Sequence, residues 1–386
     1  MLCRTMALLS QPAQLNWRPP AIDSIDSETH SVRCHWENEA DAARCEDILQ
    51  YVGESWDAQV SRIGFQAPVP DPDGILDVYL YAESSGGAFT ACNSFSDDTD
   101  DGLSACAAYI ALARSIPDAQ MASYIAHEFN HVLQYATDFT EPTYPIWEGV
   151  ATAAEQWTYP EELTPTVSYV VDYQDAPWAG ISSDGYFLWD VHKLWSYYEY
   201  GSALWVLHLD ARYGDGEGSA GVALWEATAQ EGNTNKPDVI DAYDTVTGDW
   251  REALLSLSAE RIRIGTDDSP AWAAFTGDRA TLTIGAEVSA DDLPTEVVPV
   301  LMPYTTGATY VKVTGISEGM VLTLDAAVPG DSQWGVVAVG DGLEDWAQGT
   351  TLTVEGSGDV VFGLVNLDHD DFHTTGTWPD LLSTRR

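Results

Sequence analysis

Apolar residues recur every three or four positions in the middle of the chain. These positions are Met121, Tyr124, Ile125, Phe129, Val132, Leu133 and Tyr135. No Gly or Pro interrupts them, so the spacing predicts one helix that starts within residues 115–118 and runs to about residue 137. Ser115 can cap its first turn, and Asp118 suits the positive end of the helix dipole.

Helical and strand patterns flank this helix on both sides. A second helix is expected at residues 145–157, which begin with Pro145, and an earlier one at 38–60. Strands are expected at 75–81 and 105–112. Together these elements predict a small sheet that packs on the central helix. Further helices are expected at 196–213, 219–230, 239–245 and 249–263.

Beyond about residue 270 the period changes to short alternating runs. These runs are 280–284, 296–302, 309–313, 320–324, 334–339, 351–354 and 360–365. Gly, Asp and Pro separate them, which is typical of a β-sandwich. We therefore expect an α+β chain with three parts: a partly helical N-terminal segment (1–60), a mixed domain (61–268) and a β-sandwich accessory domain (269–386).

Composition and charge narrow the classes of partner. The 386 residues are 45% hydrophobic and 11% aromatic, enough for two domains with a sizeable core. Asp and Glu number 61 against 16 Lys and Arg, so the formal net charge is −45. This charge argues against nucleic acid and anionic membranes as partners. No run approaches the roughly 18 apolar residues of a membrane helix, and we expect a soluble monomer.

A metal-binding pattern lies inside the central helix. His127 and His131 are four positions apart, so both imidazoles lie on one helix face and can bind one zinc ion. Glu128 would accept a proton from water activated by that zinc. The three-residue pattern also arises by chance, so a third ligand is needed to support it.

The third ligand is expected on the following helix. The pattern with a third His six positions after His131 is excluded, because its Gly and His positions hold Gln134 and Thr137. Glu148 lies in the first turn of the next helix, and we take it as the ligand. Glu155 lies seven positions further on the same face, where it would orient a His ring. The alternative for Glu155 is an ordinary solvated or capping carboxylate.

These motifs resemble those of the gluzincin zinc metallopeptidases. The resemblance rests on His127 to His131, on the Trp-Glu-Gly-Val-Ala run of 147–151 with Glu155, and on the Tyr-Glu-Tyr-Gly run of 198–201. It implies a zincin-like fold, one catalytic zinc ion and a protein or peptide substrate. It also implies that Tyr198 donates to the oxyanion. A packing aromatic is the alternative for Tyr198, and His192 is the second choice for the oxyanion role.

The chain is most similar to uncharacterised secreted metalloproteases of the myxobacterial type, over about residues 63–214. Two features of the chain differ from the gluzincin pattern. Trp147 stands where the clan commonly has Asn, and residues 86–93 lack the Glu with which the aminopeptidase branch holds a free amine. The resemblance therefore favours an endopeptidase.

Cysteines and acidic residues suggest export and a second cation. Cys34 with Cys45, and Cys92 with Cys106, bracket short segments and predict two local disulfides, with Cys3 left over. Five buried free thiols are the alternative. Disulfides favour an extracellular or cell-envelope location, although the first ten residues lack the apolar core of a signal peptide. Residues 96–102 are either a calcium loop or a solvated acidic loop.

Two other functional hypotheses stay open at this point. The chain could be a secreted binding or adhesion protein on a zincin scaffold, in which the β-sandwich makes the contacts. It could also hydrolyse a non-peptide amide. The spacing of His369 and His373 is better explained by chance than by a metal site.

Overall fold

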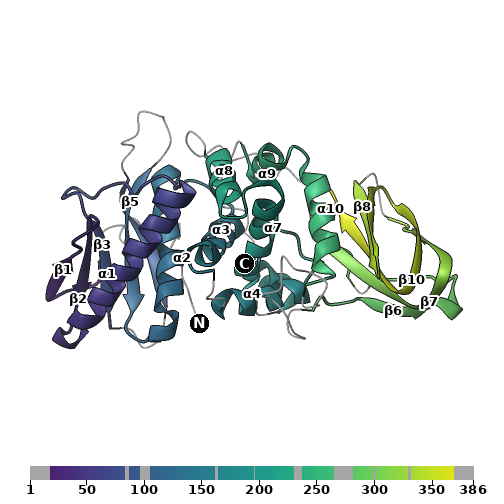
Figure 1. Cartoon of the computed structure of the whole chain (residues 1–386), viewed down its shortest axis with the longest axis horizontal. Helices are drawn as coiled ribbons and strands as arrows, with labels where there is room; N and C mark the ends of the chain where they lie inside the picture. The colour runs from purple at the N-terminus through teal and green to yellow at the C-terminus, as the bar shows by residue number, and fades with distance from the viewer. Residues whose placement is uncertain are drawn as a thin grey trace.

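Two five-stranded sheets lie at opposite ends of the molecule, with helices between them (Figure 1). The computed structural model describes residues 18–82, 87–95, 105–160, 164–194, 196–229, 237–264, 281–299, 301–328 and 332–368. The fold mixes helices with the two sheets, which is consistent with the expected α+β class. The acidic segment 96–102, the His369 and His373 pair and Cys3 lie outside the described residues.

The N-terminal sheet has three parallel strands in its centre and an antiparallel strand at each edge. Its order is β1 (Asp23–Asp26), β2 (Val32–Trp36), β3 (Leu76–Tyr81), β5 (Cys106–Ala113) and β4 (Ala88–Phe95). Every residue of β5 is buried, as expected for a strand covered on both faces. The two strands expected from the sequence are thus confirmed as β3 and β5.

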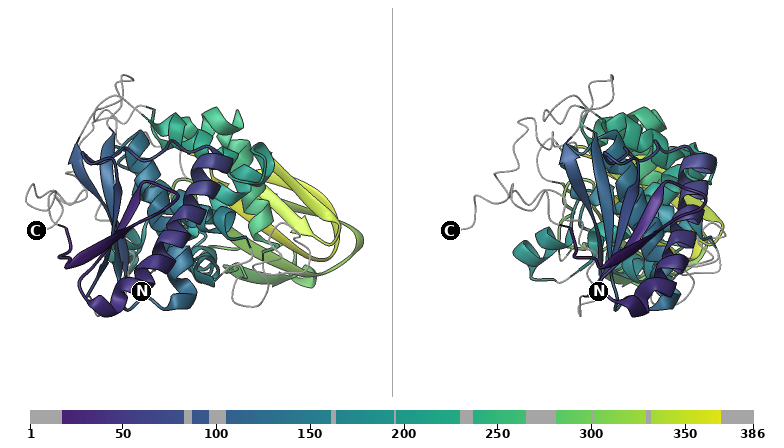
Figure 2. Two further views of the ribbon diagram at one scale, coloured as in Figure 1. Left: turned by 60° about the vertical axis from the view of Figure 1, so that its left-hand side comes forward. Right: turned by 90° about the vertical axis from the view of Figure 1, so that its left-hand side faces the viewer.

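Helix α2 is the central element of the fold. It spans Asp118–Thr137 and ends where predicted, but its N-cap residue is Pro117 rather than Ser115, and every residue from Met121 to Thr137 is buried. It packs against β5, against α1 (Ala42–Trp56) and against α3 (Tyr144–Thr158). A helix buried on all sides must satisfy its polar side chains internally. The views in Figure 2 show α1 and α2 on one side of the sheet.

Seven further helices build the middle of the molecule in the described range. They are α4 (Thr164–Asp175), α5 (Gly185–Phe187), α6 (Tyr198–Gly201), α7 (Ala203–Tyr213), α8 (Ser219–Thr228), α9 (Val239–Thr247) and α10 (Trp250–Arg261). The helix expected over 196–213 is divided into α6 and α7 at Ser202. The other three expected helices are confirmed within a few residues.

The C-terminal sheet has five hydrogen-bonded strands. Its order is β6 (Ala286–Ser289), β7 (Ala308–Asp325), β10 (Thr351–Asn366), β8 (Trp334–Gly340) and β9 (Leu343–Gln348). β7 and β10 are each one long strand where two short ones were expected. The register between them shifts around Gly358, which adopts φ +73°. No strand forms in the described parts of 280–284 and 296–302, and a sandwich of two packed sheets is not confirmed.

Helix α10 joins the C-terminal sheet to the rest of the core. A Cβ on Gly335 of β8 would lie 2.5 Å from the Leu255 side chain, so any other residue there would require Leu255 to shift. The Tyr310 hydroxyl donates to the Ser258 carbonyl at 3.0 Å, and the Trp346 indole donates to Glu252 at 2.7 Å. The expected domain boundary at 268/269 lies outside the described residues and stays a prediction.

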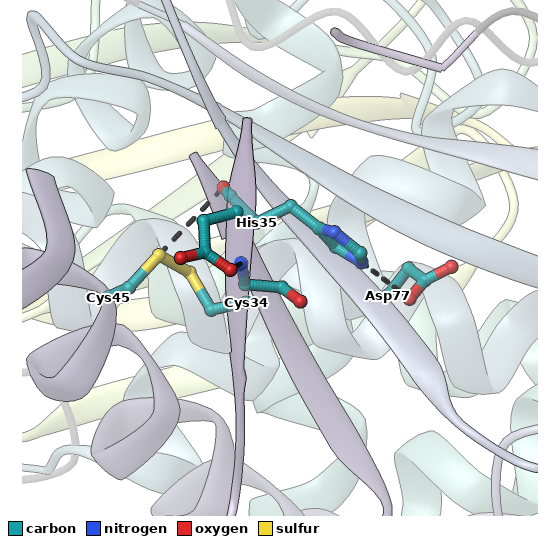
Figure 3. The surroundings of a disulfide bond; sticks show 6 residues. Cys34, His35, Cys45 and Asp77 are labelled. Carbon is teal, nitrogen blue, oxygen red and sulfur yellow. Dashed lines mark hydrogen bonds and ion pairs between the residues drawn. A yellow bond between two sulfur atoms is a disulfide. The ribbon is translucent and has the colours of Figure 1, made fainter. Parts of the chain in front are cut away.

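Both expected disulfides are present. Cys34 of β2 pairs with Cys45 of α1, and Cys92 of β4 pairs with Cys106 of β5, with Cα–Cα distances of 5.6 and 5.8 Å. Figure 3 shows the first pair next to the His35 backbone carbonyl, while the His35 ring points away from it and lies 2.8 Å from the Asp77 carboxylate. Two disulfides are compatible with an extracellular protein. Among the described helices, none is both long and apolar enough to cross a membrane.

Candidate metal centre

Three buried side chains converge between α2 and α3. The Nε2 atoms of His127 and His131 are 3.1 Å apart, and Glu148 Oε2 lies 3.1 Å from the first and 3.6 Å from the second. Ligands on one tetrahedral ion with bonds of about 2.0–2.1 Å are separated by about 3.4 Å. These residues therefore fit a single metal ion, and the two-His, one-Glu donor set is one that catalytic zinc uses. In the described residues this is the one compact group of three His, Cys, Asp or Glu side chains.

The outer nitrogen of each His ring has its own acceptor. Glu155 Oε1 lies 2.9 Å from His127 Nδ1, and the Ser123 hydroxyl donates to the other Glu155 oxygen. Gln134 Oε1 lies 2.6 Å from His131 Nδ1. Acceptors at both Nδ1 atoms favour the tautomer in which Nε2 keeps a free lone pair for a metal.

Gln134 has a role that the sequence did not reveal. In the sequence it stands where the three-His pattern requires Gly. Its amide nitrogen donates to the Trp147 carbonyl at 3.1 Å, so it also connects α2 to the residue before Glu148. Its spacing of three from His131 was the signal available in the sequence.

The Glu148 carboxylate is held in its ionised form. Burial on its own would raise its pKa, but when no metal is bound and the two His rings are protonated, the charge of His131 and the Nε2 hydrogen bonds from both rings lower the pKa well below its ordinary value. Tyr144, one turn earlier on α3, also hydrogen-bonds to this carboxylate and to Tyr200. The site is thus prepared to bind a cation.

Glu128 is fixed by the edge strand of the N-terminal sheet. It is fully buried, and its Oε2 accepts a hydrogen bond from the Thr90 hydroxyl of β4 at 2.8 Å. The same hydroxyl lies 2.8 Å from the Glu128 backbone carbonyl. Thr90 therefore orients the side chain expected to act as general base, a contact that the sequence pattern did not predict.

The structure does not bring the Tyr198 hydroxyl to the metal ligands. That hydroxyl donates to the Ala179 carbonyl at 2.9 Å, and the ring stacks on Tyr173. Tyr200 lies there instead, with its ring 5.8 Å from the His127 ring. Residues two apart on a helix point in well-separated directions, which explains the difference. His192, the second choice, contacts Tyr304 at 3.2 Å.

Gly149 allows α6 to reach the site. A Cβ at Gly149 would lie 2.3 Å from Ser202 Oγ, and this hydroxyl donates to the Pro145 carbonyl at 2.9 Å. The absence of a side chain directly after Glu148 lets the α6–α7 junction pack on α3. This packing places Tyr200 over His127.

No protein-family model matches the chain, and no curated protein matches it at a significant level. The likeness to gluzincins is carried by the short motifs alone. The function must therefore be inferred from the geometry of the site.

Proposed function

We propose that this protein is a secreted zinc-dependent peptidase of the gluzincin type with a zincin-like catalytic domain. The observation that carries the proposal is the convergence of His127, His131 and Glu148, with Glu155 and Gln134 behind the two rings. Metal-binding His residues in enzymes usually have such acceptors on their second nitrogen. The two disulfides support export.

The residues around the group have roles in this proposal that follow from their chemistry. Zinc would supply a Lewis acid that activates water and polarises the scissile carbonyl. Glu128 accepts the proton of the attacking water and then donates it to the leaving amine nitrogen. Tyr200, or Tyr144 behind it, donates a hydrogen bond to the developing oxyanion in place of the expected Tyr198.

Strand β4 gives the substrate a surface to pair with. It lies at the edge of its sheet and carries Thr90, which contacts Glu128. An extended peptide can add to such an edge through main-chain hydrogen bonds, which place few demands on sequence. We keep the endopeptidase assignment and treat the C-terminal part, with its expected sandwich, as an accessory module.

The test is cleavage of a fluorescence-quenched, denatured protein by the purified chain, with and without chelator. We expect chelator-sensitive cleavage that returns on addition of zinc. The Glu128→Gln variant should retain one zinc per chain, counted by mass spectrometry, and lose nearly all turnover, because the amide cannot accept the proton. Glu28→Gln, at an exposed position, is the matched control.

Two results would reject the proposal. Full activity in the Glu128→Gln variant would exclude the proposed mechanism, in which Glu128 is the general base. Wild-type protein that binds no zinc would show that the three side chains are not a metal site.

A further inference from the structure

The groups proposed to carry out the chemistry are closed off from solvent. His131, Glu148 and Glu128 are fully buried, and His127 is 3% exposed. A peptide bond must come within about 3 Å of such groups to react. For the site to cleave a polypeptide, a side chain that covers it therefore has to move first.

Five side chains that contact the ligands or Glu128 are buried as well. Thr90, Ser123, Gln134, Trp147 and Glu155 are each 4% exposed or less. They lie on β4, α2 and α3, the elements that pack around the site. A route to solvent on these sides would need whole elements to separate, which is a slower and larger motion than the rotation of one side chain.

A stack of three rings covers another side of the site. Tyr200 of α6 lies over His127, with the two rings 5.8 Å apart and 30° from parallel. Tyr169 of α4 lies on Tyr200 in the same way, at 4.8 Å and 31°. Tyr200 is buried, whereas Tyr169 is half-buried. The stack therefore runs from a metal ligand to a partly exposed side chain.

Two other tyrosines extend this cover, and we call Tyr144, Tyr169, Tyr197 and Tyr200 the tyrosine layer. Tyr144 hydrogen-bonds to Glu148 and to Tyr200, which ties both rings to the site. The Tyr197 ring lies 6.0 Å from Tyr169 and 6.1 Å from Tyr200. Tyr144 and Tyr197 are half-buried, as Tyr169 is. Contacts of the site thus lead to solvent through the tyrosine layer.

A glycine holds the backbone of α4 against α6. A Cβ on Gly201 would lie 2.5 Å from Tyr173 Cβ and 2.6 Å from the Tyr169 carbonyl oxygen. The two helices therefore pack closely, and α4 cannot shift without losing this contact. The half-buried Tyr169 side chain can change rotamer with the backbone in place. Rotation of this one side chain is the smallest motion that opens the stack.

We propose that Tyr169 is a gate residue: its ring closes the metal centre, and its rotation away from Tyr200 admits the substrate. This inference rests on the proposed peptidase function and adds a regulatory step at the same site. The fraction of molecules with Tyr169 rotated away limits every encounter with the metal. The gate acts on chelators as well as on substrates, since both must reach the metal from solvent.

The test measures how fast excess EDTA removes zinc from the zinc-loaded full chain in a stopped-flow instrument. Tyr169→Ala removes the ring and should speed zinc removal at least about tenfold, because the accessible fraction rises. Tyr169→Phe keeps the ring and should match the wild-type rate within about twofold. Zinc affinity at equilibrium should stay within about twofold of wild type in both variants, because a gate changes the rates of binding and release together.

The matched control is Tyr51→Ala. Tyr51 is also a half-buried tyrosine on a helix, but it lies on α1, which carries no part of the site. This control should leave the rate of zinc removal within about twofold of wild type. Circular dichroism shows whether each variant is folded. If Tyr169→Ala does not fold, Tyr169→Leu keeps an apolar side chain without a planar ring and should also speed zinc removal.

Three results would overturn the inference. They are equal rates in wild type and Tyr169→Ala, faster zinc removal in Tyr169→Phe, and the same acceleration in Tyr51→Ala, which would indicate a general loosening of the fold. Zinc removal needs no turnover, so a chain that binds zinc and cleaves nothing would reject the peptidase proposal and still test the gate. A wild-type chain that binds no zinc would reject both.

Discussion

The metal centre and the α10 junction with the C-terminal sheet are both buried, but different forces hold them. Between α2 and α3, polar groups contact polar groups: Glu155 with His127, and Gln134 with His131. At the α10 junction, Leu255 packs on Gly335 beside a few hydrogen bonds. Changes at the first region should therefore alter chemistry more than folding, and changes at the second should do the reverse.

The largest effect should come from the proposed metal ligand. Glu148→Ala removes one of three donors, so zinc content should fall from one per chain to near zero, with activity lost. Glu155→Ala removes only an orienting acceptor and should weaken zinc affinity about 10–100-fold. Competitive zinc titration with a chromophoric chelator measures both. If Glu155→Ala loses more zinc than Glu148→Ala, the third ligand has been assigned to the wrong carboxylate.

The two tyrosines of α6 should separate chemistry from packing. Tyr200→Phe should lower kcat about 10²–10³-fold, the usual cost of losing an oxyanion donor, with little change in stability. Tyr198→Phe removes a buried hydrogen bond to Ala179 and should cost about 1 kcal/mol of unfolding free energy with kcat retained. Steady-state kinetics and urea unfolding of both variants distinguish the two roles. A large loss of kcat in Tyr198→Phe, with kcat retained in Tyr200→Phe, would assign the oxyanion role to Tyr198.

At the α10 junction, truncation should affect stability alone. Leu255 is fully buried, so Leu255→Ala should lower the free energy of unfolding by about 2–5 kcal/mol through lost contacts and a cavity. Zinc content per folded molecule should stay at one. Loss of zinc from the folded variant would show that the junction also positions the metal ligands.

A smaller effect, which depends on pH, is expected at Glu199. Burial, with the nearby charge of Asp184, raises its pKa from 4.5 to about 8. The folded state then binds the proton more tightly than the unfolded state, so this group lowers stability as pH rises from about 4.5 to about 8. Glu199→Gln keeps an acceptor for Gly185 and should be more stable than wild type at pH 9, by up to a few kcal/mol, and similar at pH 4. Thermal unfolding of wild type and Glu199→Gln from pH 4 to pH 9, with Glu28→Gln as control, measures this difference in stability. Equal stability of wild type and Glu199→Gln at pH 9 would contradict the raised pKa of Glu199.

Much of the fold followed from local pattern. The range of α2 was predicted to within a few residues, and β3 and β5 were found, because periodicity and end signals are local. Strands β1, β2 and β4 were missed, since short or half-polar strands depend on their neighbours for stability. The long strands β7 and β10 were each divided in two, because Gly at bulges resembles Gly in turns.

The sequence by itself determined the grouping of His127, His131 and Glu148. Helix geometry fixes the first two, and one helix–loop–helix reversal brings in the third. Only the tertiary structure decided which tyrosine faces the site, that Thr90 holds Glu128, and that residues 189–194 meet 301–304. Those contacts join segments tens of residues or more apart, and their geometry is set by how whole elements pack rather than by any spacing along the chain.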